Sequence, residues 1–172
     1  PILEIGSFLQ DNDIDRVRKL FARESKDFLQ KYFKKELFFT DVEGKTKDEV
    51  LKNLCWKVEQ EKGLPETFTA SVLKREELTP TDYGNLVALP HPERAFQERA
   101  FVAVAVLKEP IFWFRQKVQV VFLTAIGREE DENLQQFYEA TTDLILRPAD
   151  VQNLIRHPDY DRLIQLLRRA EE

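Results

Sequence analysis

Seven consecutive apolar residues, Phe101-Val102-Ala103-Val104-Ala105-Val106-Leu107, constrain the fold of this chain more than any other feature. A strand with one face in water would alternate apolar and polar side chains. A strand that is apolar at every position is covered on both faces, as in sheets that lie between two layers of helices. The run therefore predicts a layered α/β architecture.

The rest of the chain supplies elements for such layers. Further β-rich apolar runs at Leu86–Leu89 and Val118–Ile126 predict strands, and Leu37–Phe39 and Ile111–Phe114 are short strand candidates. Apolar stripes at helical spacing predict helices over residues 13–33, 46–63, 65–72, 134–145 and 160–167. We therefore expect an α/β three-layer sandwich, with a central mixed β-sheet flanked by helices.

Composition bounds the functional class. A net charge of −5 and a pI of about 5.3 argue against nucleic-acid binding by this segment, which would favour a basic face. The longest apolar run is far shorter than the ~20 residues of a membrane helix, so we expect no membrane insertion. A single cysteine, Cys55, excludes an internal disulfide and fits a cytoplasmic protein. The chain has no methionine, so we expect a domain of a longer protein, with residues 1–32 as a linker helix and 33–172 as the domain proper.

The candidate for chemistry is His91, in the segment Gly84-Asn85-Leu86-Val87-Ala88-Leu89-Pro90-His91-Pro92. Each proline fixes its own φ and restricts the residue before it, so the imidazole sits on stiff, extended backbone just past a predicted strand. Two histidines and one cysteine offer no metal cluster, no catalytic triad can be assembled, and no phosphate-binding glycine loop occurs. A lone nucleophilic histidine favours phosphoryl carrying, whereas a packed or surface histidine in a proline-rich turn is the alternative.

The segment from Lys74 to Pro92 resembles the active-site segment of the mannitol/fructose-class enzyme IIA domains of the phosphoenolpyruvate-dependent sugar phosphotransferase system. The shared pattern is an Arg-Glu pair at Arg75-Glu76, a threonine-containing turn, a glycine, an apolar strand and Pro90-His91. A lead-in of the form Phe-x-x-Ser-Val-x-x-Arg-Glu occupies Phe68 to Glu76, and the resemblance extends from about Leu37 to about Leu167.

The resemblance implies a phosphohistidine carrier rather than a stand-alone catalyst, with no cofactor and no metal. His91 would receive a phosphoryl group from the histidine phosphocarrier protein HPr and could pass it to an enzyme IIB domain. Arg75 would bind phosphate oxygens in bidentate fashion, although a surface ion pair is an equal alternative. Asn85, Thr79 and Thr81 could donate hydrogen bonds to the phosphate, but turn formation alone would also explain them.

One departure from the family pattern points to regulation. Transport members often carry a second histidine at the start of the helix after the last strand, and Asn133 stands at that position here. Asparagine cannot take up a proton, so fast two-way transfer is in doubt. Asn133 is alternatively just a helix N-cap.

The Tyr-Gly-Asn-x-x-Ala-x-Pro-His-Pro form, Tyr83 to Pro92, resembles the enzyme IIA-like domains at the C-terminus of PRD-containing, BglG-type transcription regulators and antiterminators. We therefore expect a phosphocarrier domain of a sugar-responsive regulator that contacts other domains of the same protein. A transport enzyme IIA that relays phosphate to a sugar permease is the first alternative, and a non-phosphorylated interaction module is the second.

Overall fold

A computed structural model describes residue 16 and residues 29–129 and 133–169 of the chain. The helix expected over residues 13–33 lies largely outside the described residues; within them, residues 29–32 are helical. Leu29 and Tyr32 are buried in the same core cluster as Phe33, so the residues just before the first strand pack against the domain. The boundary between residues 32 and 33 stays a prediction.

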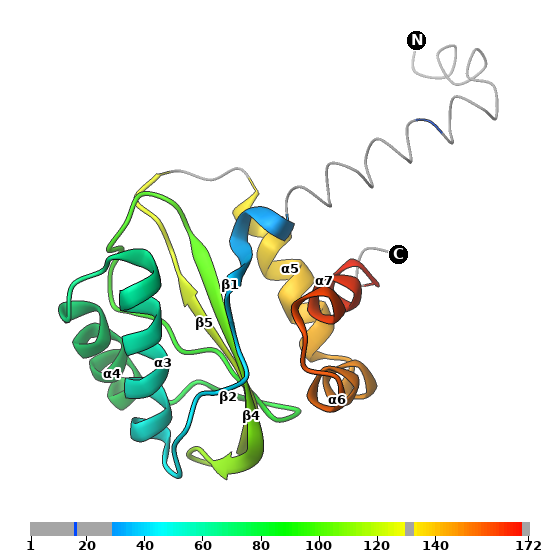
Figure 1. Ribbon diagram of the computed structural model, residues 1–172, viewed down its shortest axis with the longest axis horizontal. Coiled ribbons are helices and arrows are strands. Elements are labelled where there is room, and N and C mark those ends of the chain that lie inside the picture. Colours follow the sequence, from blue (N-terminus) through cyan, green and yellow to red (C-terminus); the bar gives the residue numbers. More distant parts are fainter. Residues whose placement is uncertain (1–15, 17–28, 130–132, 170–172) are drawn as a thin grey trace.

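The sheet is mixed and has five strands in the order β1-β4-β5-β3-β2 (Figure 1). β1 is parallel to β4 and β3 is parallel to β5, whereas β4–β5 and β2–β3 are antiparallel pairs. The elements in chain order are β1 (Phe33–Phe39), α3 (Lys47–Lys62), α4 (Thr67–Leu78), β2 (Asp82–Gly84), β3 (Val87–Ala88), β4 (Phe101–Phe112), β5 (Lys117–Ala125), α5 (Leu134–Ile145), α6 (Pro148–Arg156) and α7 (Tyr160–Arg169).

Helices cover both faces of this sheet, which confirms the expected three-layer sandwich. Figure 1 shows α3 and α4 on one side and α5, α6 and α7 on the other. The continuous apolar run in β4 serves both layers: Val102, Val104 and Val106 belong to the core beneath α5–α7, and Ala103 and Ala105 to the core beneath α3 and α4. The run has no polar positions because neither face of the strand meets water.

Local signals set the ends of α3 as expected. The Thr46 side chain accepts a hydrogen bond from the Glu49 N–H at the N-cap, and Gly63 ends the helix at φ 64°, the left-handed conformation that glycine adopts without strain. In a capping box the Glu49 carboxylate would accept a hydrogen bond from the N–H of the cap residue, Thr46. Here it accepts from the N–H of Lys45, one residue before the cap.

The strands differ from expectation at their ends. Ile111 and Phe112 do not form a separate strand: they continue β4 beyond an irregularity in its pairing with β5. β3 holds only two of the four residues expected, and the three-residue β2 was not expected. Leu86 has φ 67°, outside the β region, so its position belongs to the turn before β3.

No helix among the described residues is both long and apolar enough to span a membrane.

Candidate functional site

His91 lies just beyond the end of β3, where the carboxyl ends of the parallel strands β3 and β5 meet. This is the edge of an α/β sheet at which binding sites usually form. Three hydrogen bonds hold the backbone on either side of His91. Leu89 N–H donates to Thr81 O (3.0 Å), and Thr124 N–H donates to Pro90 O (3.0 Å). Glu93 N–H donates to Ser71 Oγ (2.7 Å). The histidine segment is thus held from three places: the turn between α4 and β2, strand β5 and helix α4.

The orientation of the His91 ring follows from one contact. Its Nδ1 lies 3.2 Å from the carbonyl oxygen of Leu89. A carbonyl can only accept, so Nδ1 must carry the proton in this contact. In the neutral ring Nε2 then holds the free lone pair, and Nε2 is the nitrogen available to attack.

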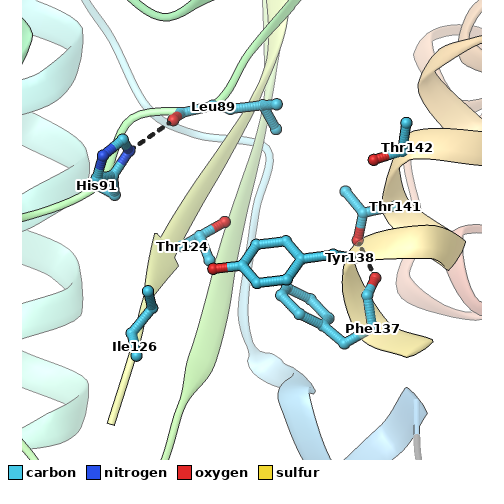
Figure 2. A pocket seen from close by; sticks show the side chains of 8 residues that line it. All are labelled: Leu89, His91, Thr124, Ile126, Phe137, Tyr138, Thr141 and Thr142. Carbon is cyan, nitrogen blue, oxygen red and sulfur yellow. Dashed lines mark hydrogen bonds between the residues drawn. The ribbon is translucent and has the colours of Figure 1, made fainter. Parts of the chain in front are cut away.

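A cavity of about 250 Å³ opens beside the histidine. Figure 2 shows His91 and Leu89 on one side and α5 on the other, with Thr124 of β5 between them. The lining is mostly apolar, with hydroxyl groups interspersed, and consists of Leu89, His91, Thr124, Ile126, Phe137, Tyr138, Thr141 and Thr142. A mostly apolar cavity with a few polar groups is typical of binding sites.

Tyr138 on α5 brings a phenol hydroxyl to the lining of this cavity. Its ring extends from the helix toward Thr124, and burial raises the pKa of its phenol above the usual value (Figure 2). The hydroxyl therefore stays protonated at neutral pH and can donate a hydrogen bond within the cavity. The Thr141 hydroxyl, in contrast, already donates to Phe137 O within the helix (3.0 Å).

The predicted phosphate ligands are not among the residues that line this cavity. Arg75 donates from Nη1 to Thr79 O (3.0 Å), across the C-terminal end of α4. Thr81 donates both its N–H (2.9 Å) and its hydroxyl (2.8 Å) to the carboxylate of Glu76. These groups hold the turn between α4 and β2, and their role toward a phosphate stays a prediction.

The two asparagines are placed at opposite ends of α5. Asn85 has φ 53° in the β2–β3 turn, and its amide Nδ2 donates to Ile145 O (2.7 Å) at the end of the helix. Asn133 occupies the N-cap position of α5, as one alternative expected, but its side chain makes no capping hydrogen bond to the helix. Whether Asn133 corresponds in function to the second histidine of transport members stays a prediction.

Two residues that sequence reasoning passed over, Ser71 and Glu76, hold the site together. Both are buried and both project from α4, Ser71 to the backbone of Glu93 and Glu76 to Thr81 and Trp113. The signal was present, because both residues stand in the Phe68–Glu76 lead-in. A polar side chain on a helix does not, however, show its partner in the sequence.

Cys55 is buried in the core between α3 and the sheet. Burial raises the pKa of its thiol to about 12, so it is not a nucleophile at neutral pH. In the part of the chain that the structure describes, no three His, Cys, Asp or Glu side chains are grouped so that they could hold a metal ion.

Comparisons with known proteins show which family and which fold this chain shares. Residues 31–170 match the family model described as phosphoenolpyruvate-dependent sugar phosphotransferase system, EIIA 2. The chain is 34% identical over 163 residues to the probable licABCH operon regulator of Bacillus subtilis, covering 95% of this chain and 25% of that protein. It is 27% identical over 120 residues to the transcriptional regulator ManR of the same species, covering 70% of this chain and 18% of ManR.

Among solved structures, the fold is similar to the complex of enzyme IIA and phosphorylated enzyme IIB for mannitol from Escherichia coli. The TM-score is 0.64 at 18% identity, with 78% of this chain and 97% of the other covered. At that identity the likeness concerns the fold alone. The chain spans about a quarter or less of the length of the two regulators it matches.

Proposed function

Because the chain belongs to the EIIA 2 family of the phosphoenolpyruvate-dependent sugar phosphotransferase system, we propose that it is a phosphocarrier domain whose acceptor is Nε2 of His91. The observation that carries this proposal is the 3.2 Å contact between His91 Nδ1 and Leu89 O, which leaves Nε2 as the nucleophile. The donor is a phosphohistidine on a carrier of the HPr type.

The transfer needs no additional base, because the attacking Nε2 carries no proton. The Nε2 lone pair forms the new P–N bond, the P–N bond of the donor breaks, and its electron pair returns to the donor imidazole. The His91 ring becomes positively charged as the bond forms, and the Leu89 carbonyl stabilises that charge through Nδ1–H. The fixed backbone on both sides of the ring supplies the alignment on which phosphoryl transfer depends.

The domain is proposed to act within a cytoplasmic, sugar-responsive transcription regulator. Its similarity to the licABCH operon regulator and to ManR supports this role. Phosphorylation would add about two negative charges beside the cavity, which would change its contacts with other domains of the same protein. The alternative is a transport enzyme IIA that relays phosphate to a sugar permease.

Incubation with labelled phosphoenolpyruvate, enzyme I and HPr tests the acceptor. We expect label on the wild type and on His157→Ala, which lacks the other histidine, and none on His91→Ala. Equal labelling of wild type and His91→Ala would refute His91 as the acceptor, and no label on either protein would favour a non-phosphorylated interaction module. Rapid passage of the label to an enzyme IIB and on to sugar would instead favour the transport alternative.

A further inference from the structure

Glu76 is a buried carboxylate that the proposed transfer does not use. Its side chain is 2% exposed and lies near the end of α4, beneath the turn into β2. It accepts three hydrogen bonds: two on Oε1, from Trp113 Nε1 (2.7 Å) and Thr81 N–H (2.9 Å), and one on Oε2, from the Thr81 hydroxyl (2.8 Å). A carboxylate is costly to bury without donors, and these three donors compensate for that cost.

The bonds of Glu76 lead directly to His91. Thr81, which gives Glu76 both its N–H and its hydroxyl, accepts the Leu89 N–H on its own carbonyl (3.0 Å). The Leu89 carbonyl, on the other side of that residue, is the acceptor for His91 Nδ1. Two residues therefore connect the carboxylate to the ring, and each link is a hydrogen bond with a fixed direction.

We propose that Glu76 is a positioning residue that sets, through Thr81 and Leu89, which ring nitrogen of His91 is left free. Its consequence for phosphoryl transfer rests on the proposed function. The effect depends on acceptor geometry and not on charge. Glutamine at this position keeps Oε1 for Trp113 and the Thr81 N–H, and its amide can donate to the Thr81 hydroxyl, which also accepts.

The chain offers a matched control in Glu59. This second buried glutamate is 6% exposed and also accepts both the N–H (3.0 Å) and the hydroxyl of one threonine, Thr69. It joins α3 to the start of α4 and has no bond to the segment that carries His91. Glu59→Ala and Glu76→Ala therefore remove the same kind of interaction from two different places.

The experiment measures the ring ¹⁵N chemical shifts of His91 in the unphosphorylated protein, at the alkaline plateau of its titration, together with the rate of phosphoryl uptake from HPr. In the wild type and Glu76→Gln we expect the Nδ1–H tautomer. In Glu76→Ala we expect a mixture of tautomers and uptake at least about tenfold slower, because a displaced ring loses its alignment. Glu59→Ala lowers the melting temperature but keeps the wild-type tautomer.

Two results would overturn the proposal: an unchanged tautomer in Glu76→Ala, or an equal change in Glu59→Ala. If Glu76→Ala does not fold, Trp113→Phe removes one of the three bonds and keeps an aromatic ring. In Trp113→Phe, a smaller change in tautomer in the direction expected for Glu76→Ala supports the positioning role. An unchanged tautomer contradicts it. The tautomer is read without phosphate, so a wild type that shows the expected tautomers but takes up no label refutes the proposed function alone.

Discussion

A single backbone carbonyl, that of Leu89, determines how His91 presents its ring. The two flanking prolines predicted a stiff segment, and the structure adds that both are buried and that the Pro90 carbonyl is paired with Thr124. The sequence predicted His91 as the nucleophile but did not predict which of its ring nitrogens is free. Which nitrogen is free depends on the position of the Leu89 carbonyl relative to the ring. No residue pattern shows that position.

The single residue Cys55 allows a quantitative prediction of how stability depends on pH. Burial raises the pKa of its thiol from an ordinary value near 9 to about 12, so the unfolded chain releases this proton at lower pH than the native protein. Stability therefore falls as the pH rises above about 9, with a slope from this group of up to about 1.4 kcal/mol per pH unit.

Urea denaturation of the wild type and Cys55→Ala, compared between about pH 8 and about pH 11, isolates this contribution, because other titrating groups cancel in the difference. We expect the wild type to lose stability more steeply. Parallel curves for the two proteins would show that the thiol ionises as readily in the native state as in the unfolded chain.

The β2–β3 turn is the element that departs most from ordinary backbone. Asn85 and Leu86 both have positive φ, at 53° and 67°. Asparagine tolerates this conformation better than most residues. Nothing in the sequence predicted it for Leu86, or the bond from Asn85 to the end of α5.

Substitutions of Asn85 distinguish a structural role of this residue in the turn from a role in binding phosphate. Asn85→Ala loses both the hydrogen bond to Ile145 O and the tolerance of positive φ, and we expect a loss of about 2 kcal/mol. Asn85→Gly loses only the hydrogen bond, and we expect about 1 kcal/mol. Denaturant unfolding measures both values.

Labelling from HPr is the complementary measurement on these variants. Phosphoryl uptake by Asn85→Gly at the wild-type rate indicates a structural role for the amide. A large fall in that rate with little loss of stability would instead support the phosphate-binding role that the family resemblance implies.

Helix α4 illustrates what sequence patterns leave out. Its apolar stripe predicted a helix, and Phe68 and Val72 lie in the core as that stripe requires. Its two buried polar groups bond to residues distant in sequence, Ser71 to Glu93 and Glu76 to Trp113. Ser71 and Glu76 fall on the same helix face as Phe68 and Val72, so the helical period places them toward the core. The partners that satisfy these buried polar groups come from the tertiary structure, which the period does not show.

For the whole molecule, the unbroken apolar run in β4 predicted the three layers, because only a strand between two cores lacks polar positions. The strand order was not predictable from the same run, since pairing depends on contacts between distant segments. It is this order that sets β3 beside β5 and brings His91 to the cavity under α5.

The central claim is that this fold holds His91 with Nε2 free to accept a phosphoryl group. The most direct test is ³¹P and ¹⁵N NMR of the protein after reaction with phosphoenolpyruvate, enzyme I and HPr, with His157→Ala as the matched control. We predict one phosphoryl group on Nε2 of His91, in the wild type and in His157→Ala alike. Phosphate on Nδ1, on another residue, or on none would contradict the account.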